Sequence, residues 1–190
     1  ALLERARRIR LGFGWEEGTE MGPLISPEHR EKVEGYVHLA QEEGARLLLG
    51  GERPADPRFA AGNFLEPTIL DELPSDGRVA QEEIFGPVLT VETFDSPAEA
   101  LRLANGTDTG LAAAVWTEDI PKAYALGREL RFGTVWLNDF HPYYPQAPWG
   151  GYKQSGVGRE LGLTGLREYQ EEKHLYLNME VAAGGWFGEG

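Results

Sequence analysis

The 190-residue chain contains no cysteine. Disulfide bonds, thiolate metal sites and a cysteine nucleophile are therefore excluded for these residues. The four histidines are scattered along the sequence without the spacing of metal ligands: His29, His38, His141 and His174. We therefore predict no metal site.

Positive charge is also scarce. The sequence has 18 Lys and Arg against 31 Asp and Glu, which gives a formal net charge of -13. An electrostatic field of that sign repels a nucleic-acid backbone and an anionic membrane surface. No apolar run approaches the roughly 20 residues that cross a bilayer. We therefore predict no nucleic-acid partner and no membrane partner, and we expect a cytoplasmic location.

Apolar runs alternate with helical patterns in the middle of the chain. Strands are predicted at 88–94, 111–116 and 134–137. Of the two helical segments between them, the first opens with a capping box at Ser96 and the second opens at Glu118 and Asp119. Short links between strand, helix and strand favour right-handed crossovers, so these strands are expected to be parallel neighbours. The sequence therefore predicts an α/β fold with a mostly parallel sheet and flanking helices.

The two ends of the chain carry further helical and strand patterns. We predict a helix over 2–10, a helix capped by Ser26, and strands at "ARLLLGG" and 62–69, the second interrupted by Pro67. Near the other end we predict a short helix over 163–169, a strand at "KHLYLNM" (173–179) and a loose tail.

The segment "QAPWGGYKQSGVGRELG" (146–162) follows the strand at 134–137. In open parallel sheets the ligand crevice lies beyond the carboxyl ends of the strands, so this segment is expected to line a site. Its glycines do not have the spacing of a dinucleotide fingerprint, and Lys153 lies on the wrong side of the next glycine for a phosphate-binding loop. Ser155 lacks the GxSxG context of a hydrolase nucleophile.

Two other segments admit two interpretations each. In "QEEIFGP" (81–87) an acid could accept hydrogen bonds from sugar hydroxyls, and Phe85 could pack on a flat ring. Alternatively, this segment is a solvated acidic turn whose Phe lies in the core. The aromatic side chains between 141 and 149 could bind a cationic ligand through their ring faces, or they form an ordinary packed loop: His141, Tyr143, Tyr144 and Trp149.

Four motifs, "EEIFGPV", "GLAAAVW", "GTVWLND" and "PWGGYKQSGVGRELG", occur in the order found in the aldehyde dehydrogenase superfamily, which the chain resembles over nearly its whole length. "NDFHPYYPQAPWGGYKQSGVGREL" is similar to bacterial betaine aldehyde dehydrogenases in particular, and "TEMGPLIS" also resembles a family segment. The resemblance implies an incomplete catalytic domain at 1–170, and an oligomerisation-type strand and tail at 171–190.

The resemblance also implies roles for individual residues. Glu83 matches a carboxylate that holds the nicotinamide ribose, and Phe85 matches the ring beside the nicotinamide. Trp149 and Tyr143 match the wall of the substrate site, which in betaine aldehyde enzymes surrounds trimethylammonium. Glu160 matches a glutamate of the proton relay.

Members of this superfamily oxidise an aldehyde with NAD or NADP through a nucleophilic cysteine, which this sequence lacks. We therefore expect the C-terminal part of such an enzyme, inactive and without bound cofactor by itself, as a truncated product, a cut piece or half of a split enzyme. Its expected partners are further copies of itself or a complementary N-terminal half. The alternative is a non-catalytic binding or assembly module.

Overall fold

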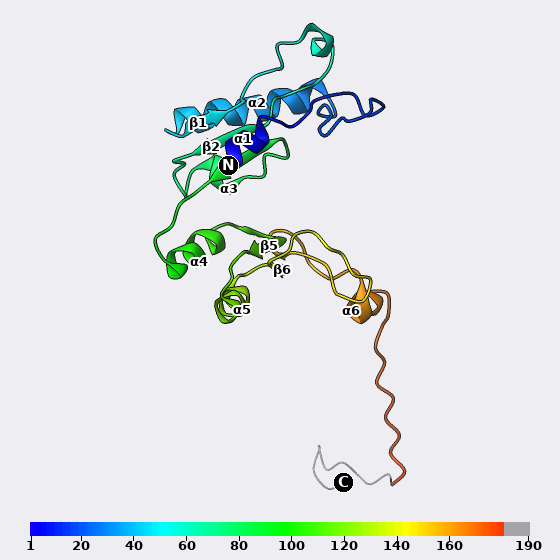
Figure 1. The fold of residues 1–190 in the computed structure, drawn as a ribbon. Coiled ribbons are helices and arrows are strands. Elements are labelled where there is room, and N and C mark those ends of the chain that lie inside the picture. Colours follow the sequence, from blue (N-terminus) through cyan, green and yellow to red (C-terminus); the bar gives the residue numbers. More distant parts are fainter. Residues whose placement is uncertain (181–190) are drawn as a thin grey trace, which may run out of the picture.

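The computed structural model describes residues 1–180, so the end of the predicted tail lies outside the described residues. Figure 1 shows two groups of elements, one above the other, joined by the chain that runs from strand β3 to helix α4. The first group ends at residue 91 and the second begins at residue 97. Within the described residues no helix has both the length and the hydropathy of a membrane span.

Helix α2 (Pro27–Glu42) is the longest helix of the first group. Ser26 begins it as predicted, because the serine Oγ accepts a hydrogen bond from the His29 backbone N–H at 3.2 Å. Its buried side chains are Val33, Val37 and Ala40. The predicted helix at the N-terminus is shorter than expected and covers Leu2–Ala6 as α1.

Three strands form the sheet that α2 covers. Strand β1 (Arg46–Leu49) pairs antiparallel with β2 (Thr68–Asp71), and β2 pairs in parallel with β3 (Val88–Val91). Strand β2 begins only after Pro67, because proline has no N–H to donate to a neighbouring strand. The short elements η1 (Pro57–Phe59) and α3 (Arg78–Gln81) complete this group.

The second group is built from α4 (Pro97–Asn105), β5 (Ala112–Val115), α5 (Ile120–Glu129) and β6 (Thr134–Leu137). Strands β5 and β6 pair in parallel, and α5 packs against both of them. Helix α4 has its predicted cap, and α5 begins at the predicted place with Asp119 as its cap. Ser96 Oγ accepts from Glu99 N at 3.2 Å, and an Asp119 carboxylate oxygen accepts from Lys122 N at 3.0 Å.

The α/β fold is confirmed, but the prediction that three consecutive strands share one sheet is wrong. Strand β3 belongs to the first sheet and is not hydrogen-bonded to β5. Asn105 supplies a physical reason, because its side chain ties the end of α4 to the end of α5. Its amide donates to Glu129 O at 2.9 Å and its oxygen accepts from Arg131 N at 2.8 Å. Helix α4 therefore packs beside α5 and does not carry the chain back to β3.

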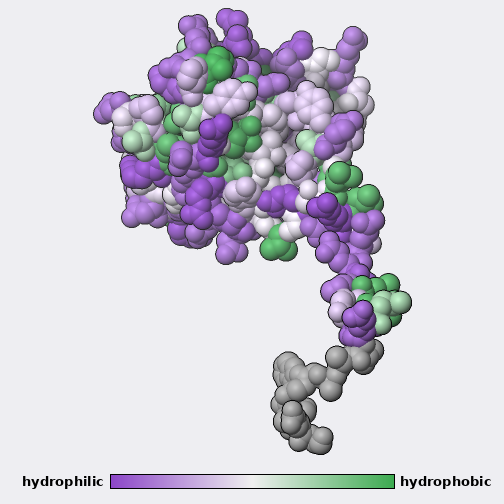
Figure 2. Space-filling view, turned by 90° about the horizontal axis from the view of Figure 1, so that it is seen from below, coloured by the Kyte–Doolittle hydropathy of each residue, from purple (hydrophilic) through white to green (hydrophobic). Residues whose placement is uncertain are grey.

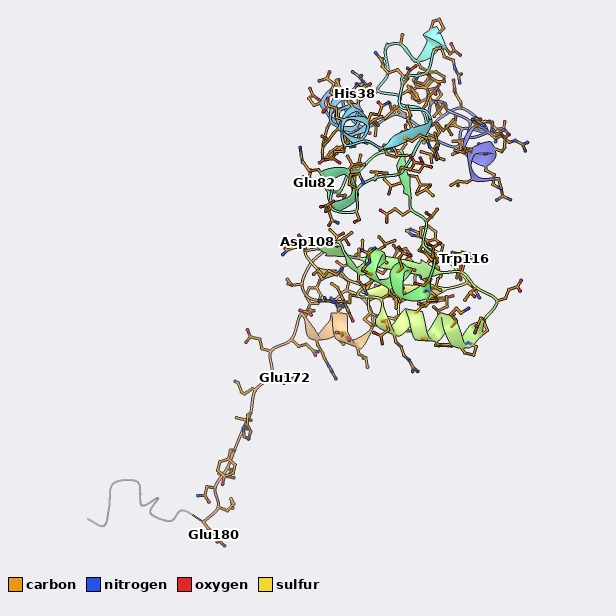
Figure 3. The ribbon with its side chains drawn as sticks, turned by 90° about the vertical axis from the view of Figure 1, so that its left-hand side faces the viewer. His38, Glu82, Asp108, Trp116, Glu172 and Glu180 are labelled. Atoms are coloured by element: carbon orange, nitrogen blue, oxygen red, sulfur yellow. The ribbon has the colours of Figure 1, made fainter. Side chains whose placement is uncertain are left out.

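The C-terminal segment contains a two-residue strand and a short helix. Strand β7 (Tyr152–Lys153) pairs antiparallel with β4 (Thr109–Gly110), and α6 (Gly162–Arg167) follows. The predicted strand at 173–179 is not formed, because these residues pair with no strand among residues 1–180, and Figure 3 shows the chain between Glu172 and Glu180 leading away from both groups. The oligomerisation role of this segment stays a prediction.

Candidate functional site

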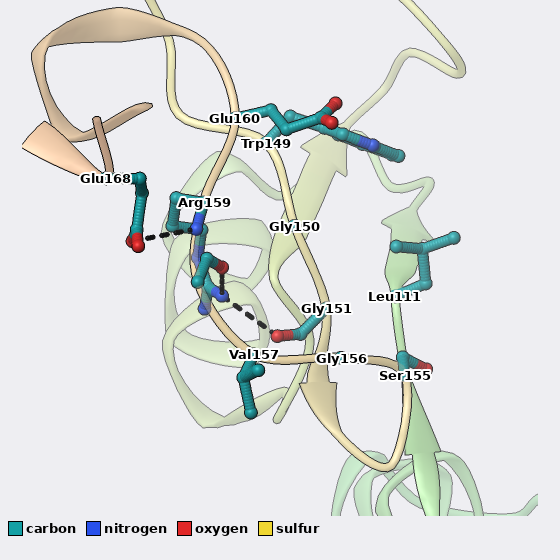
Figure 4. Close-up of a pocket in the computed structure, with 11 residues that line it drawn as sticks. Leu111, Trp149, Gly150, Gly151, Ser155, Gly156, Val157, Arg159, Glu160 and Glu168 are labelled. Atoms are coloured by element: carbon teal, nitrogen blue, oxygen red, sulfur yellow. Dashed lines mark hydrogen bonds between the residues drawn. The ribbon is translucent and has the colours of Figure 1, made fainter. Parts of the chain in front are cut away.

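The glycine-rich segment folds back on itself around a bridge between Trp149 and Glu160. The backbone N–H of each residue donates to the carbonyl of the other at 2.7 Å. Beside this bridge lies a hollow of about 400 Å³ (Figure 4). Gly151 is buried here, and a Cβ at this position would collide with Ser155. Glycine is required because two stretches of chain approach too closely for a side chain.

Arg159 stabilises the backbone around the hollow through hydrogen bonds. Its Nη1 donates to Gly158 O at 2.6 Å and to Gly151 O at 3.0 Å, and its backbone N–H donates to the Glu168 carboxylate at 3.2 Å (Figure 4). Sequence reasoning did not single out Arg159. Arg159 lies within the quoted motif, but no local pattern assigns it a role, because its partners are backbone carbonyls that only the folded loop brings together.

Ser155 and Lys153 also have structural partners. Ser155 Oγ accepts a hydrogen bond from Gly110 N at 2.8 Å, which agrees with the absence of a hydrolase motif. Lys153 Nζ donates to the carbonyls of Asn105 and Thr107 at 3.2 and 2.8 Å. Burial lowers the pKa of Lys153 from its ordinary value, and the neighbouring Arg131 lowers it further.

Three of the four predicted aromatic side chains, His141, Tyr143 and Trp149, gather around Trp136 of β6, whereas the exposed Tyr144 does not join them. The Trp149 ring centre is 4.6 Å from that of Tyr143 and 6.0 Å from that of the buried Trp136. His141 meets Tyr143 edge-on, with 4.8 Å between ring centres. Tyr143 still exposes 46% of its surface. The cluster is therefore anchored in the core on one side and open to a ligand on the other.

Glu160 is exposed, and Figure 4 shows its side chain running beside that of Trp149. The structure thus brings three predicted site residues together: Trp149 and Glu160 line one hollow, and Tyr143 packs on Trp149.

Glu83 and Phe85 line a different hollow, of about 310 Å³, between α3 and β3. The two adjacent acids of the motif differ in their contacts. Glu82 accepts hydrogen bonds from Tyr36 Oη and Arg78 Nε, both at 2.7 Å, and these bonds, that of Arg78 first, lower its pKa to about 2. Glu83 forms no side-chain hydrogen bond within residues 1–180, so its carboxylate is free to bind a ligand.

Phe85 is 73% exposed and has a φ of 59°, in the left-handed region. The interpretation of this segment as a turn around a core Phe is therefore wrong. Ile84 supplies the core contact instead, packing against the buried cluster that contains Leu70 and Val79. An exposed ring and a free carboxylate suit a planar ligand that carries hydroxyl groups. The two hollows share no lining residue, so the structure does not join the two predicted sets of site residues.

A model of the aldehyde dehydrogenase family matches residues 1–175. The chain belongs to the aldehyde dehydrogenase family. It is 60% identical over 186 residues to the betaine aldehyde dehydrogenase of Bacillus subtilis strain 168, a match that covers 98% of this chain and 38% of that enzyme. It is 43% identical over 176 residues to the betaine aldehyde dehydrogenase of Mesorhizobium japonicum, covering 93% of this chain and 36% of that enzyme.

Solved structures agree with this family assignment. The betaine aldehyde dehydrogenase of Staphylococcus aureus in complex with NAD⁺ superposes with a TM-score of 0.93 and 50% identity, covering 99% of this aldehyde dehydrogenase chain and 37% of that chain. Other structures of that enzyme carry a modified cysteine or substitutions in a consecutive His, Pro and Tyr. The present chain spans 38% of the length of its B. subtilis relative.

No cluster of three or more potential metal ligands occurs within residues 1–180.

Proposed function

We propose that this chain is the C-terminal part of an NAD(P)-dependent aldehyde dehydrogenase whose substrate is betaine aldehyde. The observation that carries the proposal is the edge-to-face pair of Tyr143 and Trp149, with 4.6 Å between ring centres, above the anchoring Trp136. In a chain of this family, such a partly open aromatic wall is suited to a quaternary ammonium group, because ring faces attract cations.

The neighbouring structures support the same substrate. Several are variants of a betaine aldehyde dehydrogenase substituted in a His–Pro–Tyr triple. This chain contains one such triple, at 141–143. His141 and Tyr143 pack against each other here, so the triple shapes the same aromatic wall.

Glu83 and Phe85 fit one end of a nicotinamide dinucleotide. The carboxylate of Glu83 would accept hydrogen bonds from ribose hydroxyls, and the exposed Phe85 ring would pack beside the nicotinamide. When bound, the cofactor accepts a hydride. Glu160, exposed beside Trp149, would pass protons between the site and solvent.

We propose that the chain alone is inactive. It has no cysteine to attack the aldehyde, and covalent catalysis needs nucleophile and base together. Glu83 and Phe85 contact only one end of the cofactor, and hydride transfer requires cofactor and substrate to be held together. The active assembly would then need a complementary N-terminal part, together with further copies of the chain.

A second candidate function is that of a non-catalytic assembly module. The segment 173–179 favours it, because all four of its apolar side chains are exposed: Leu175, Tyr176, Leu177 and Met179. A segment of this kind adds a strand to the sheet of a partner.

The substrate proposal is tested in a single polypeptide that joins the preceding part of the B. subtilis relative to this chain. We expect kcat/KM for betaine aldehyde to exceed that for its uncharged carbon isostere. Trp149→Ala should reduce the preference about tenfold, since a desolvated cation–π contact contributes about 1–2 kcal/mol. Trp116→Ala, at an exposed tryptophan away from the hollow, is the control. Equal kcat/KM values for the two aldehydes in the unsubstituted enzyme would refute this proposal.

A further inference from the structure

Two side chains of α2 are hydrogen-bonded to the loop that carries Glu83 and Phe85. His29 Nε2 lies 2.7 Å from the carbonyl oxygen of Phe85. Because a carbonyl only accepts, Nε2 carries the proton. Two turns further along α2, Tyr36 Oη donates to the Glu82 carboxylate at 2.7 Å. The loop is thus held at two points, one on each side of Glu83.

Between these two points the loop packs directly on the helix. A Cβ at Gly86 would meet Val33 Cγ2 at 2.7 Å, so the loop backbone touches the Val33 side chain. His29, Val33 and Tyr36 have the i, i+4, i+7 spacing of a single helix face. One face of α2, between His29 and Tyr36, therefore contacts the loop.

The hydrogen bonds from α2 leave free the two groups that would meet a ligand, although the His29 ring also lies beside the Phe85 ring, with 6.1 Å between ring centres. Helix α2 contacts the carbonyl of Phe85, and the ring remains 73% exposed. Tyr36 and Arg78 bind Glu82, so the adjacent carboxylate of Glu83 is left without a hydrogen bond within the described residues. Phe85 also has a positive φ of 59°, which is unfavourable for a bulky side chain without external support. The His29 hydrogen bond supplies such support at the same residue.

We propose that His29 and Tyr36 are positioning residues, which hold the loop of residues 82–87 so that Glu83 and Phe85 face the nicotinamide end of the cofactor. The inference rests on the proposed function for its cofactor, but the loop positioning is measurable without it. The bond from Tyr36 is stable across the neutral range, because the pKa of Glu82 is about 2 and the carboxylate stays ionised.

The first test is hydrogen exchange in the 190-residue chain itself. Removing one hydrogen bond should speed exchange in the loop about fivefold, so we expect that change in peptides covering 82–87 for His29→Ala and for Tyr36→Phe. Exchange in β2 should stay unchanged. His29→Gln retains an N–H donor of similar reach and should restore most of the protection.

The matched control is His38→Ala. His38 lies on the same helix, nine residues from His29 and so on the opposite face at 3.6 residues per turn, and its side chain is exposed (Figure 3). Unchanged loop exchange in His29→Ala, or a rise of equal size in β2, would overturn the positioning role whether or not the chain supports catalysis.

The second test uses the single polypeptide joined to the preceding part of the B. subtilis relative. His29→Ala should lower kcat about tenfold and leave KM for NAD within about twofold, since misplaced Glu83 and Phe85 would affect hydride transfer more than overall cofactor affinity. His29→Gln should recover kcat. If His29→Ala speeds loop exchange but leaves kcat unchanged, the loop contact is structural only and the positioning role is refuted. An inactive unsubstituted polypeptide would refute the proposed function alone and leave the exchange result to decide loop positioning.

Discussion

Trp149 and Glu160 exchange two backbone hydrogen bonds of 2.7 Å, although eleven positions separate them in the sequence. This bridge closes the glycine-rich segment into a loop and places the aromatic wall beside the proposed proton-relay carboxylate. The glycines inside the loop permit the close approach of its two sides. Arg159 stabilises the loop by donating hydrogen bonds to the carbonyls of Gly151 and Gly158. The motif thus combines loop closure with the placement of two candidate site residues, Trp149 and Glu160, in one hollow.

Arg159→Met should loosen this loop and destabilise the fold. The substitution keeps an apolar stem but removes the charged hydrogen bonds to Gly151 O and Gly158 O, and bonds of this kind contribute about 1.5–3 kcal/mol. Chemical denaturation should show a loss of about 2 kcal/mol. Arg128→Met, at an exposed arginine of α5, is the control and should change stability by less than about 0.5 kcal/mol. Equal stability of the two variants would contradict the role of Arg159.

Glu82→Gln should destabilise the chain in a pH-dependent way. Hydrogen bonds from Arg78 and Tyr36 lower the pKa of Glu82 from 4.5 to about 2 in the folded state. A carboxylate whose pKa is lower in the folded state stabilises the fold at any pH above its unfolded-state pKa. This contribution is lost as the pH falls to the folded-state pKa. The difference in unfolding free energy between wild type and Glu82→Gln should therefore be full at pH 7 and shrink between about pH 4.5 and pH 2.

Glu83→Gln is the matched control for this titration, because it removes the same charge from the next residue. The Glu83 carboxylate forms no side-chain hydrogen bond within residues 1–180, so the loss of unfolding free energy in Glu83→Gln at pH 7 should be small. A pH profile for Glu82→Gln that matched the control would show that the Tyr36 and Arg78 contacts do not act as described.

The chain should self-associate through its C-terminal segment. Figure 2 shows hydrophobic side chains on the part of the chain that projects from the body, and Leu175 and Leu177 are 86% and 77% exposed. Exposed apolar strands of this kind pair with other chains. Light scattering at micromolar concentration should give a mass above 21.0 kDa, and Leu175→Lys with Leu177→Lys should reduce it. A monomer over a wide concentration range would contradict this expectation.

Local signals predicted much of the fold, because capping residues and apolar runs act over a few positions. Ser26 and Ser96 cap their helices as expected, and the helix predicted to open at Glu118 and Asp119 begins there. The predicted strands at 111–116 and 134–137 pair in parallel. The sheet partner of β3 was predicted wrongly, since pairing depends on where Asn105 anchors α4, and no local pattern encodes that contact.

The candidate site was predictable only in part. Motif residues such as Trp149 and Glu160 came from family resemblance, and the structure brings them into one hollow. The contacts that hold the site were not visible in the sequence, because His29 lies 56 positions from its partner Phe85 and shares no motif with it. Similarly, only the fold distinguishes Glu82, which binds Tyr36, from the adjacent Glu83.

We propose that this chain supplies the substrate wall and the nicotinamide contacts of an aldehyde dehydrogenase but not its nucleophile. The most direct measurement is aldehyde-dependent NADH formation by the purified chain alone and by the single polypeptide joined to the preceding part of the B. subtilis relative. The account predicts no NADH from the chain alone and turnover from the joined polypeptide that falls on Glu83→Gln. NADH formation by the chain alone that also falls on Glu83→Gln, or a folded joined polypeptide without turnover, would contradict it.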